Sequence, residues 1–188
     1  MTNSQAKRQT GYAAFLRGIN VGGHRRIGMD ALKQAFESLG FENIQTLLAS
    51  GNVVFQAPRT NASILTQQIQ EGLKKAFGVE IGVLIRSIKE LQSLHRTNPF
   101  RGIKVTPRTR FFVTFLPEKP ASRLKFPYVS PDGSFKLLRP SSYEVCSVLT
   151  ITNLRRGMQF MGFLDREFGR RVTTRSWNTI TRILQASE

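Results

Sequence analysis

Apolar residues recur along the chain at two spacings, and each spacing predicts one kind of element. Short apolar runs that end at glycine or at turn residues are typical of strands, whereas apolar residues three or four positions apart are typical of amphipathic helices. By this pattern the first half holds strands at 11–18, 43–49, 52–57 and 79–85 and helices at 29–39, 61–77 and 88–94. This order predicts a ferredoxin-like βαββαβ unit followed by one further helix.

Capping signals set the ends of these helices. Asn61 is a candidate N-cap, because its side chain can accept from backbone N–H groups of the first turn, and Gly78 is a candidate stop. Ser87 and Glu90 have the spacing of a capping box. Gly51 lies between two of the strands, where glycine supplies the positive φ of a hairpin turn.

The second half repeats the same order of elements. The pattern predicts strands at 109–116, 134–140, 143–151 and 172–175 and helices at 121–125, 158–168 and 176–184. Two landmarks also recur: Phe-Leu ends the first strand of each half, and Phe-Gly precedes an Arg-Ser pair that opens a helix. We therefore predict an α+β fold of two ferredoxin-like βαββαβ repeats, with mostly antiparallel sheets and helices on one face.

Helical spacing also predicts which side chains of the last two helices share a face. In the first of them these residues are Met158, Met161, Leu164 and Phe168. In the second, the residues expected to face inward are Trp177, Ile180 and Leu184.

The repeats divide the chain into four segments: a disordered tail at 1–10, a first repeat with a glycine loop at 11–95, a basic linker at 96–107 and a second repeat at 108–188. The linker contains two prolines, and no acid occurs from Leu91 to Pro117. Proline and charge of a single sign are typical of a loop.

Composition adds a strong basic charge to this picture. The 188 residues are 40% hydrophobic, which suffices for a packed interior, but 28 Lys and Arg oppose only 12 Asp and Glu, a net charge of +16. Residues 1–94 hold 11 bases and 6 acids (+5), and residues 95–188 hold 17 bases and 6 acids (+11). Such a field attracts polyanions in a salt-dependent way. A solubilising surface, selective nucleic-acid binding and binding of small phosphorylated or carboxylated ligands all stay open.

Several functional classes are disfavoured. No apolar run approaches the roughly 18 residues that span a bilayer, and the polar N-terminal tail lacks the apolar segment of a secretory signal. We therefore expect no membrane association and a cytoplasmic location, which the single Cys146 also fits. With two histidines far apart and one cysteine, we expect no metal site, and we expect no cofactor. The acids are few and lie mostly on predicted helix surfaces, which disfavours paired-carboxylate chemistry.

The stretch FLRGINVGGHRRIGM, residues 15–29, contains four glycines before the first predicted helix. Its spacing fits neither the P-loop, which needs Lys-Ser/Thr after the last glycine, nor the dinucleotide-binding Gly-x-Gly-x-x-Gly pattern. Backbone N–H groups in such a turn can nevertheless hold an anion at a helix N-terminus. The alternative is that the glycines only allow a tight turn.

One asymmetry favours a functional role for this glycine loop. The second repeat has PEKPAS at the equivalent point, so the predicted fold does not itself require a glycine cluster. The candidate anion-binding residues are Arg17, Gly18, Asn20, Gly22, Gly23, His24, Arg25 and Arg26.

The secondary candidates are Ser50, Asn52, Arg86, Arg175 and Trp177. Ser50 lacks the Gly-x-Ser-x-Gly frame of an exposed nucleophile, and Asn52 can satisfy either local backbone or a ligand. Arg86 and Arg175 would occupy related positions if the repeats pack pseudo-symmetrically, and with Arg17 they would then line one cleft. We expect Trp177 to pack across its repeat.

The stretch RTRFFVTF, residues 108–115, partly matches the signature of RNA-binding sheets, which ends in Phe-Val-x-Phe. To stack on a base, Phe112 would have to share an exposed face with Arg110. Phe111, Val113 and Phe115 share the opposite face and suit a core. The alternative is a strand that is buried on both faces.

Particular motifs resemble a known family. RGINVGG at 17–23, LGFENIQT at 39–46 and SGNVVF at 50–55 closely resemble the bacterial family called domain of unknown function 1697. TTRSW at 173–177 is similar to that family's Thr-Thr-Arg-Asn-Trp, with Ser176 where Asn is commoner. The resemblance runs from about Tyr12 to Leu184. It implies an α+β fold and a soluble, cytoplasmic protein, and it implies no reaction.

These observations leave three functional hypotheses. The first is binding of an anionic partner, with nucleic acid favoured, through the glycine loop and the basic surface. The second is an enzyme that acts on a small phosphorylated or carboxylated substrate at the same loop, with Arg17 and Asn20 as orienting groups. The third is a non-catalytic protein-interaction module in which charge only solubilises.

Overall fold

The structure is a computed structural model that describes residues 9–20, 26–120, 122–138, 140–141, 143–151 and 154–188. Contacts divide the described chain into two compact units. Unit 1 runs up to Ser93 and takes in Arg182–Glu188, and unit 2 is Leu94–Thr181. The division falls within two helices, α3 (Ile88–Thr97) and α5 (Trp177–Ala186).

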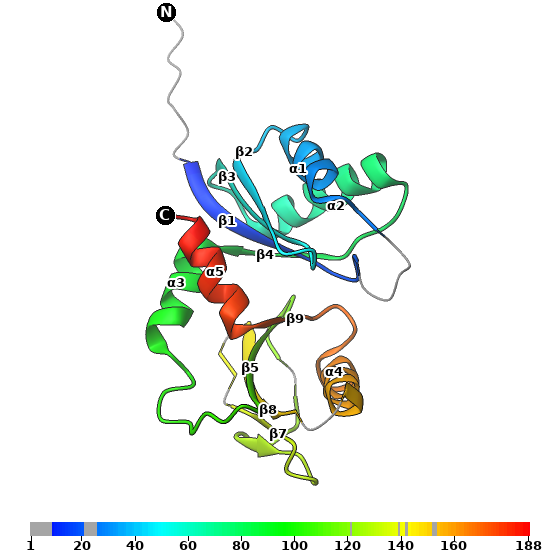
Figure 1. The fold of residues 1–188 in the computed structure, drawn as a ribbon. Coiled ribbons are helices and arrows are strands. Elements are labelled where there is room, and N and C mark those ends of the chain that lie inside the picture. The colour runs from blue at the N-terminus through cyan, green and yellow to red at the C-terminus, as the bar shows by residue number, and fades with distance from the viewer. Residues whose placement is uncertain (1–8, 21–25, 121, 139, 142, 152–153) are drawn as a thin grey trace, which may run out of the picture. The chain divides into compact units, whose positions relative to one another are not determined.

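Unit 1 contains a four-stranded sheet and two helices on one of its faces (Figure 1). Its elements are β1 (Gln9–Leu16), α1 (Met29–Glu37), β2 (Glu42–Leu47), β3 (Asn52–Pro58), α2 (Ala62–Phe77) and β4 (Val83–Ser87). The strand order is β2-β3-β1-β4, and every neighbouring pair is antiparallel. The predicted order of elements is confirmed in this half.

The core of unit 1 lies between the sheet and the two helices. Alternate residues of each strand point to this side, because side chains of a strand alternate between faces. Phe55 of β3 is fully buried against Phe36 of α1, with ring centroids 5.4 Å apart, and against Phe41, at 4.7 Å. Packing of this kind, rather than helix propensity alone, holds the short helix α1 in place.

The predicted capping signals are confirmed. The Asn61 side chain accepts a hydrogen bond from the Ser63 N–H (2.9 Å), and Gly78 ends α2 with a left-handed φ of +69°. Glu90 accepts from both the N–H and the hydroxyl of Ser87 (2.7 Å each), and Ser87 Oγ accepts from the Glu90 N–H (3.2 Å). These bonds satisfy backbone donors that the ends of the helices would otherwise leave unpaired.

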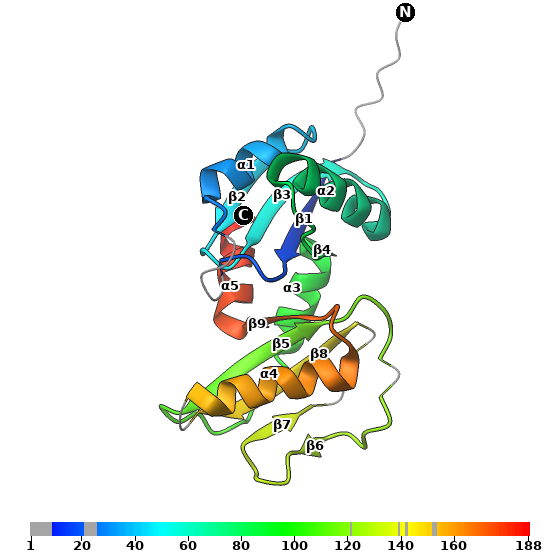
Figure 2. The same ribbon diagram turned by 90° about the vertical axis from the view of Figure 1, so that its right-hand side faces the viewer.

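Unit 2 contains a five-stranded sheet with one helix across a face (Figure 2). Its elements are β5 (Thr109–Phe115), β6 (Tyr128–Val129), β7 (Phe135–Leu137), β8 (Glu144–Thr150), α4 (Leu154–Phe168) and β9 (Thr173–Ser176). The strand order is β6-β7-β8-β5-β9, and every neighbouring pair is antiparallel. Phe160 and Leu164 of α4 are buried in the core.

One prediction for unit 2 is wrong, and a second is confirmed only in part. Residues 122–125 form no helix, and Ala121 lies outside the described residues. Instead, the Ser122 hydroxyl accepts from the Leu124 N–H (3.0 Å) and donates to Glu167 (2.6 Å), so local side-chain bonds replace a helical turn.

The predicted apolar face of α4 is confirmed only in part, because Leu164 is buried and Phe168 packs against the core but the two methionines of that face are exposed. Met158 is 76% exposed and Met161 is 38% exposed, whereas Phe160 is fully buried. Apolar residues surround much of this helix, so spacing alone does not choose the face. The bulkier Phe160 and the Leu164 one turn later fill the core.

The described chain is thus a mixed α+β protein with antiparallel sheets, as predicted at that level, and its described residues form five helices rather than the six predicted. None of the described helices combines the length and the apolar character that a membrane crossing requires.

Candidate functional site

The glycine loop follows β1 directly, and the structure describes it at 17–20 and 26–28. The Arg17 N–H donates to Gly82 O (2.8 Å), which holds the start of the loop beside the segment before β4. The Arg17 side chain is half-buried and Arg26 is exposed. The remaining predicted residues of the loop, Gly22, Gly23, His24 and Arg25, lie outside the described residues.

Asn20 closes this loop with its side chain. Its Nδ2 donates to Ile27 O (3.0 Å) and to Ala49 O (2.8 Å), and its Oδ1 accepts from the Ile27 N–H (2.8 Å). Both amide hydrogens are therefore in use. Asn20 also has a φ of +55°, a left-handed conformation that asparagine tolerates better than most residues. This geometry gives Asn20 a role in holding the loop, rather than a free amide for a substrate.

The turn between β2 and β3 packs closely against the start of the loop. Leu16 N–H donates to Gly51 O (2.8 Å), and a Cβ added to Gly51 would lie 2.7 Å from Ile19 Cδ1. Gly51 also has a φ of +76°. Glycine is needed here for both its conformation and its lack of a side chain.

Asn52 and Ser50 belong to this same turn. Asn52 is fully buried at the start of β3, and its Nδ2 donates to Leu47 O (3.0 Å) and to Ser50 Oγ (3.2 Å). Of the two interpretations that the sequence allows for Asn52, these bonds favour service to the local backbone. Ser50 is exposed beside it.

Arg86 and Arg175 occupy matching positions in different units. Arg86 of β4 pairs with Ala13 of β1, and Arg175 of β9 pairs with Val113 of β5. Arg86 is buried and its Nη1 donates to Ile85 O (2.8 Å). Arg175 Nη1 donates to Thr173 Oγ1 (2.8 Å) and to Thr174 O (3.0 Å).

Burial lowers the pKa of Arg175 to about 10, although part of the residue stays accessible. Desolvation disfavours the charged form, and the backbone and hydroxyl acceptors offset part of that cost. The guanidinium remains charged at pH 7, because the pKa stays well above that pH. The joint cleft of Arg17, Arg86 and Arg175 draws on both units and stays a prediction.

The aromatic residues of β5 are engaged in the fold of unit 2. Phe112 packs against Phe160 with ring centroids 5.6 Å apart, so it lies toward α4 rather than on an open sheet face. Phe111 stacks on Phe100 at 4.4 Å on the other side. Both faces of β5 are therefore partly covered, and base stacking on Phe112 is not favoured.

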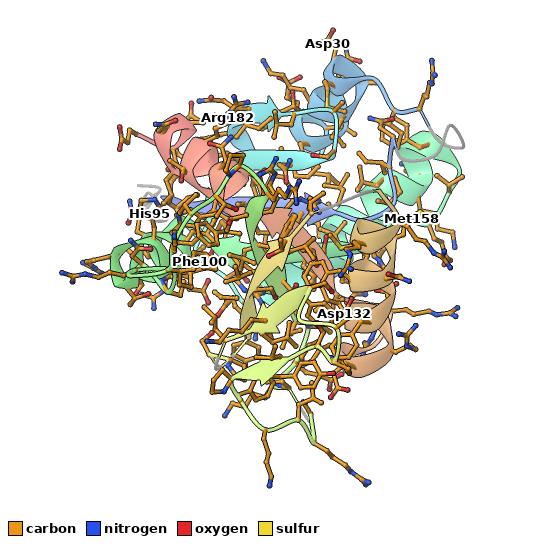
Figure 3. All side chains as sticks on the ribbon, turned by 60° about the horizontal axis from the view of Figure 1, so that its bottom comes forward. Asp30, His95, Phe100, Asp132, Met158 and Arg182 are labelled. Carbon is orange, nitrogen blue, oxygen red and sulfur yellow. The ribbon has the colours of Figure 1, made fainter. Side chains whose placement is uncertain are left out.

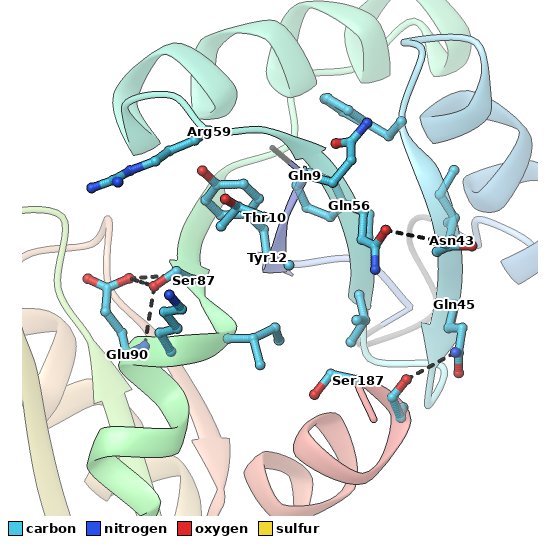
Figure 4. A pocket seen from close by; sticks show the side chains of 18 of the residues that line it. Gln9, Thr10, Tyr12, Asn43, Gln45, Gln56, Arg59, Ser87, Glu90 and Ser187 are labelled. Atoms are coloured by element: carbon cyan, nitrogen blue, oxygen red, sulfur yellow. Dashed lines mark hydrogen bonds between the residues drawn. The ribbon is translucent and has the colours of Figure 1, made fainter. Parts of the chain in front are cut away.

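Unit 1 contains a groove of about 1210 Å³ (Figure 4). It lies at the ends of β1, β2 and β3, beside the start of α3 and the C-terminal residues. Five carboxamide side chains line it: Gln9, Asn43, Gln45, Gln56 and Gln92. Asn43 Nδ2 donates to Gln56 Oε1 (2.7 Å), and Gln45 Nε2 donates to Ala186 O (3.0 Å).

The groove is close to neutral, in contrast to the chain as a whole. Its charged lining residues are three bases and three acids, Lys33, Arg59, Lys89, Glu37, Glu90 and Glu188. Glu90 is committed to the capping box with Ser87. Carboxamides and hydroxyls suit a neutral hydrogen-bonding ligand, because they both donate and accept, and balanced charge gives no attraction for phosphate.

Sequence reasoning missed this groove. Its amides come from three strands and a helix, and β2 has an irregular register between Glu42 and Gln45. The available signal was alternation: Gln9 and Gly11 of β1 share one face, opposite Tyr12. Gly11 leaves room there, since an added Cβ would lie 3.0 Å from Ile88 Cγ1.

Nothing in the described part of the chain forms a group of three or more His, Cys, Asp or Glu side chains placed to hold a metal ion. The described acids serve local structure instead. Asp132 accepts from the hydroxyls of Ser134 (2.7 Å) and Ser130 (2.8 Å), which, with the Ser134 N–H and Arg156, lower its pKa to about 2.

Cys146 should be inert as a nucleophile in the folded protein. Burial, and to a smaller extent Glu144, raises the pKa of its thiol to about 12, so thiolate is scarce at pH 8. We expect a thiol reagent such as dithionitrobenzoate to label Cys146 at least about 100-fold more slowly in the native protein than in urea. Equal rates in the two states would contradict the buried position.

Comparison with known proteins identifies a family and a solved structure of the same fold. Residues 9–126 match the family described as "Protein of unknown function (DUF1697)". The chain belongs to this family. No curated protein matches it. The matched range of this DUF1697 chain covers β1 to β5 and so includes the glycine loop and most of the groove.

A solved structure has the same fold as this DUF1697 protein. It is described as that of the conserved bacterial protein SP0830 from Streptococcus pneumoniae, with a TM-score of 0.71 and 18% sequence identity. The match covers 96% of this chain and 100% of that one. At this identity the likeness concerns the fold alone. The motif TTRSW lies beyond the residues matched to the DUF1697 family.

Proposed function

We propose that this DUF1697 protein binds an anionic partner, with nucleic acid favoured, through the glycine loop and its basic surface. The observation that carries the proposal is the net charge of +16, with an excess of 11 bases in residues 95–188. The basic side chains of residues 95–188 are mostly exposed where the structure describes them, and Arg96 and Lys104 are examples. Exposed bases without nearby acids release counterions when they meet phosphates, which drives polyanion binding.

The described residues at the two ends of the glycine loop support a contribution of this loop to anion binding. Arg17 and Arg26 lie on its two sides. Gly28 precedes α1 as its N-cap and carries no side chain to accept from the first-turn N–H groups. Those groups can therefore face an anion. The neutral groove of unit 1 gives no comparable support to a phosphorylated substrate, so we propose no reaction there.

We infer further that the two units are repeats of one ferredoxin-like plan. In support, β7-β8-β5-β9 follows the same order as β2-β3-β1-β4. Leu16 N–H donates to Gly51 O, and Leu116 N–H donates to Tyr143 O, each at 2.8 Å and each at the C-terminal end of the first strand of its unit. The second unit departs from the plan where residues 122–125 replace a helix.

A cytoplasmic location belongs to the same proposal. Its support is the single cysteine, Cys146, which is buried as a free thiol. Extracellular proteins commonly use cysteines in pairs, whereas a lone reduced thiol suits a reducing compartment.

Filter binding of labelled RNA and DNA across a salt series tests the proposal. We expect the logarithm of the association constant to fall linearly with the logarithm of salt concentration, with a slope of about −0.7 per phosphate contact on single strands. Arg26→Ala should reduce that slope by about 0.7 if the loop contributes a contact. Lys75→Ala, an exposed base on α2, is the matched control. Absent or salt-independent binding would overturn the proposal.

A further inference from the structure

One stretch of unit 2 concentrates basic residues and contains no acid in its own sequence. Its five basic side chains are all exposed: Arg96, Arg101, Lys104, Arg108 and Arg110. The described residues include no ion pair with any of them, and the sequence has no acid between Glu90 and Glu118. Most solubilising surfaces interleave both signs of charge, so this stretch is unusual even in a basic protein.

The segment that carries these bases has a defined conformation. Arg101 N–H donates to Asn98 O (3.0 Å), Ile103 N–H to Phe100 O (3.1 Å) and Thr109 N–H to Thr106 O (2.9 Å), forming successive turns. Phe100, in its middle, is buried against unit 2. The bases are therefore presented from a fixed backbone, which lowers the entropy that a ligand must remove on binding.

Phe100 belongs to a row of four aromatic side chains. The His95 ring is stacked on Trp177 with centroids 5.1 Å apart and planes at 7°. Trp177 meets Phe100 edge to face at 5.1 Å, and Phe100 stacks on Phe111 at 4.4 Å. Phe100 is buried, whereas His95, Trp177 and Phe111 are only half-buried. Figure 3 labels His95 and Phe100 at the end of α3.

The row and the bases are interleaved along the chain. His95 precedes Arg96 and Phe100 precedes Arg101, whereas Arg110 lies on the opposite face of β5 from its neighbour Phe111. Proteins bind single strands with two features, basic side chains and partly open aromatic rings. The cationic side chains contact the phosphates, and the rings stack on unpaired nucleobases. A duplex hides the faces of its bases within its own stack, so it can use the cations but not the rings.

We propose that residues 95–111, with Trp177, form a binding surface for single-stranded nucleic acid, independent of its sequence. This inference rests on the proposed polyanion binding and assigns it a place and a form of ligand. Contacts are to phosphates and base faces, so uracil and thymine strands are both expected to bind.

Fluorescence of Trp177 offers a direct test, because it is the only tryptophan of the chain. We expect titration with 20-nucleotide oligo(U) and oligo(dT) to quench its emission, because bases quench indole on contact. A 20-base-pair duplex should bind more weakly and quench less. A structural role for the aromatic row alone would leave the emission unchanged.

A pair of matched variants locates the surface. Arg101→Gln with Lys104→Gln removes two cations of the segment, and Lys75→Gln with Lys89→Gln removes two exposed cations of unit 1. At about 0.1 M salt, losing two single-strand contacts should weaken binding roughly 25-fold and reduce the salt slope by about 1.4. The control pair should weaken it only a few-fold. All four residues are exposed, so we expect both double variants to fold as the unsubstituted protein does.

The outcomes separate the two proposals. Equal weakening by both pairs, unchanged Trp177 emission during binding, or a duplex bound as tightly as single strands would overturn this surface and leave polyanion binding standing. No binding of any nucleic acid at low salt would overturn the proposed function itself. Quenching by single strands together with selective loss in the Arg101→Gln, Lys104→Gln variant supports both.

Discussion

Replacing Gly51 with alanine should lower the free energy of unfolding by about 2–4 kcal/mol. Two costs add. The φ of +76° disfavours any residue with a Cβ, and that Cβ would lie 2.7 Å from Ile19 Cδ1 and 2.9 Å from Leu16 Cβ. Leu16 is also hydrogen-bonded to Gly51 O, so the turn cannot move away without breaking that bond. Urea unfolding followed by circular dichroism measures the change.

Gly40→Ala provides the matched control for Gly51→Ala. Gly40 lies in the same unit and has a similar φ of +79°, but a Cβ added there would meet nothing within 4 Å. Only the conformational cost applies, so we expect a loss of about 1–2 kcal/mol. The difference between the two variants isolates the close approach of the hairpin turn to the loop. Similar losses in both would show that this approach is not tight in solution.

How far the sequence could predict the fold depends on the range of the interaction that decides each feature. The N-cap Asn61 and the box of Ser87 and Glu90 are decided within three residues, and the structure agrees with both predictions. The predicted helix does not form at 122–125, because the Ser122 hydroxyl bonds to the Leu124 N–H and to Glu167, far along the chain. No local pattern contains that partner.

Packing against a core is decided at long range as well. The α4 sequence is apolar on more than one side, and spacing grouped Met158 and Met161 on one face with Leu164, which is buried. The exposure of the two methionines follows from the competing fit of Phe160, which packs between Phe112 and Phe135. The choice required knowledge of the sheet beneath the helix. A periodic pattern therefore predicts that a helix is amphipathic more reliably than it predicts which face is buried.

The candidate sites show the same division. The glycine spacing drew attention to the region after β1, where Gly18 and Asn20 both have positive φ. The groove in unit 1 forms because side chains from three strands point to the same side of the sheet. The carboxamide residues that line it have no regular spacing in the sequence. The row of His95, Trp177, Phe100 and Phe111 joins residues up to 82 positions apart, so only the fold brings it together.

Asn20 gives the second large expected effect. Asn20→Ala removes three hydrogen bonds, leaves Ile27 N–H, Ile27 O and Ala49 O without that partner, and places alanine at a φ of +55°. Net contributions of about 1 kcal/mol for each bond, together with about 1–2 kcal/mol for alanine at positive φ, predict a loss of about 4–5 kcal/mol in the free energy of unfolding. Amide exchange of Ile27 should accelerate more than exchange in the strands of unit 2.

Asn43→Ala is the comparison that separates the clamp from the conformation. Asn43 has a nearly equal φ of +50°, but its exposed side chain makes a single bond, to Gln56 Oε1 (2.7 Å). We expect this variant to lose about 1–2 kcal/mol, since an exposed bond contributes little and the conformational cost remains. If Asn20→Ala costs no more than Asn43→Ala, the side chain of Asn20 does not hold the loop, and its amide becomes available again as a ligand group.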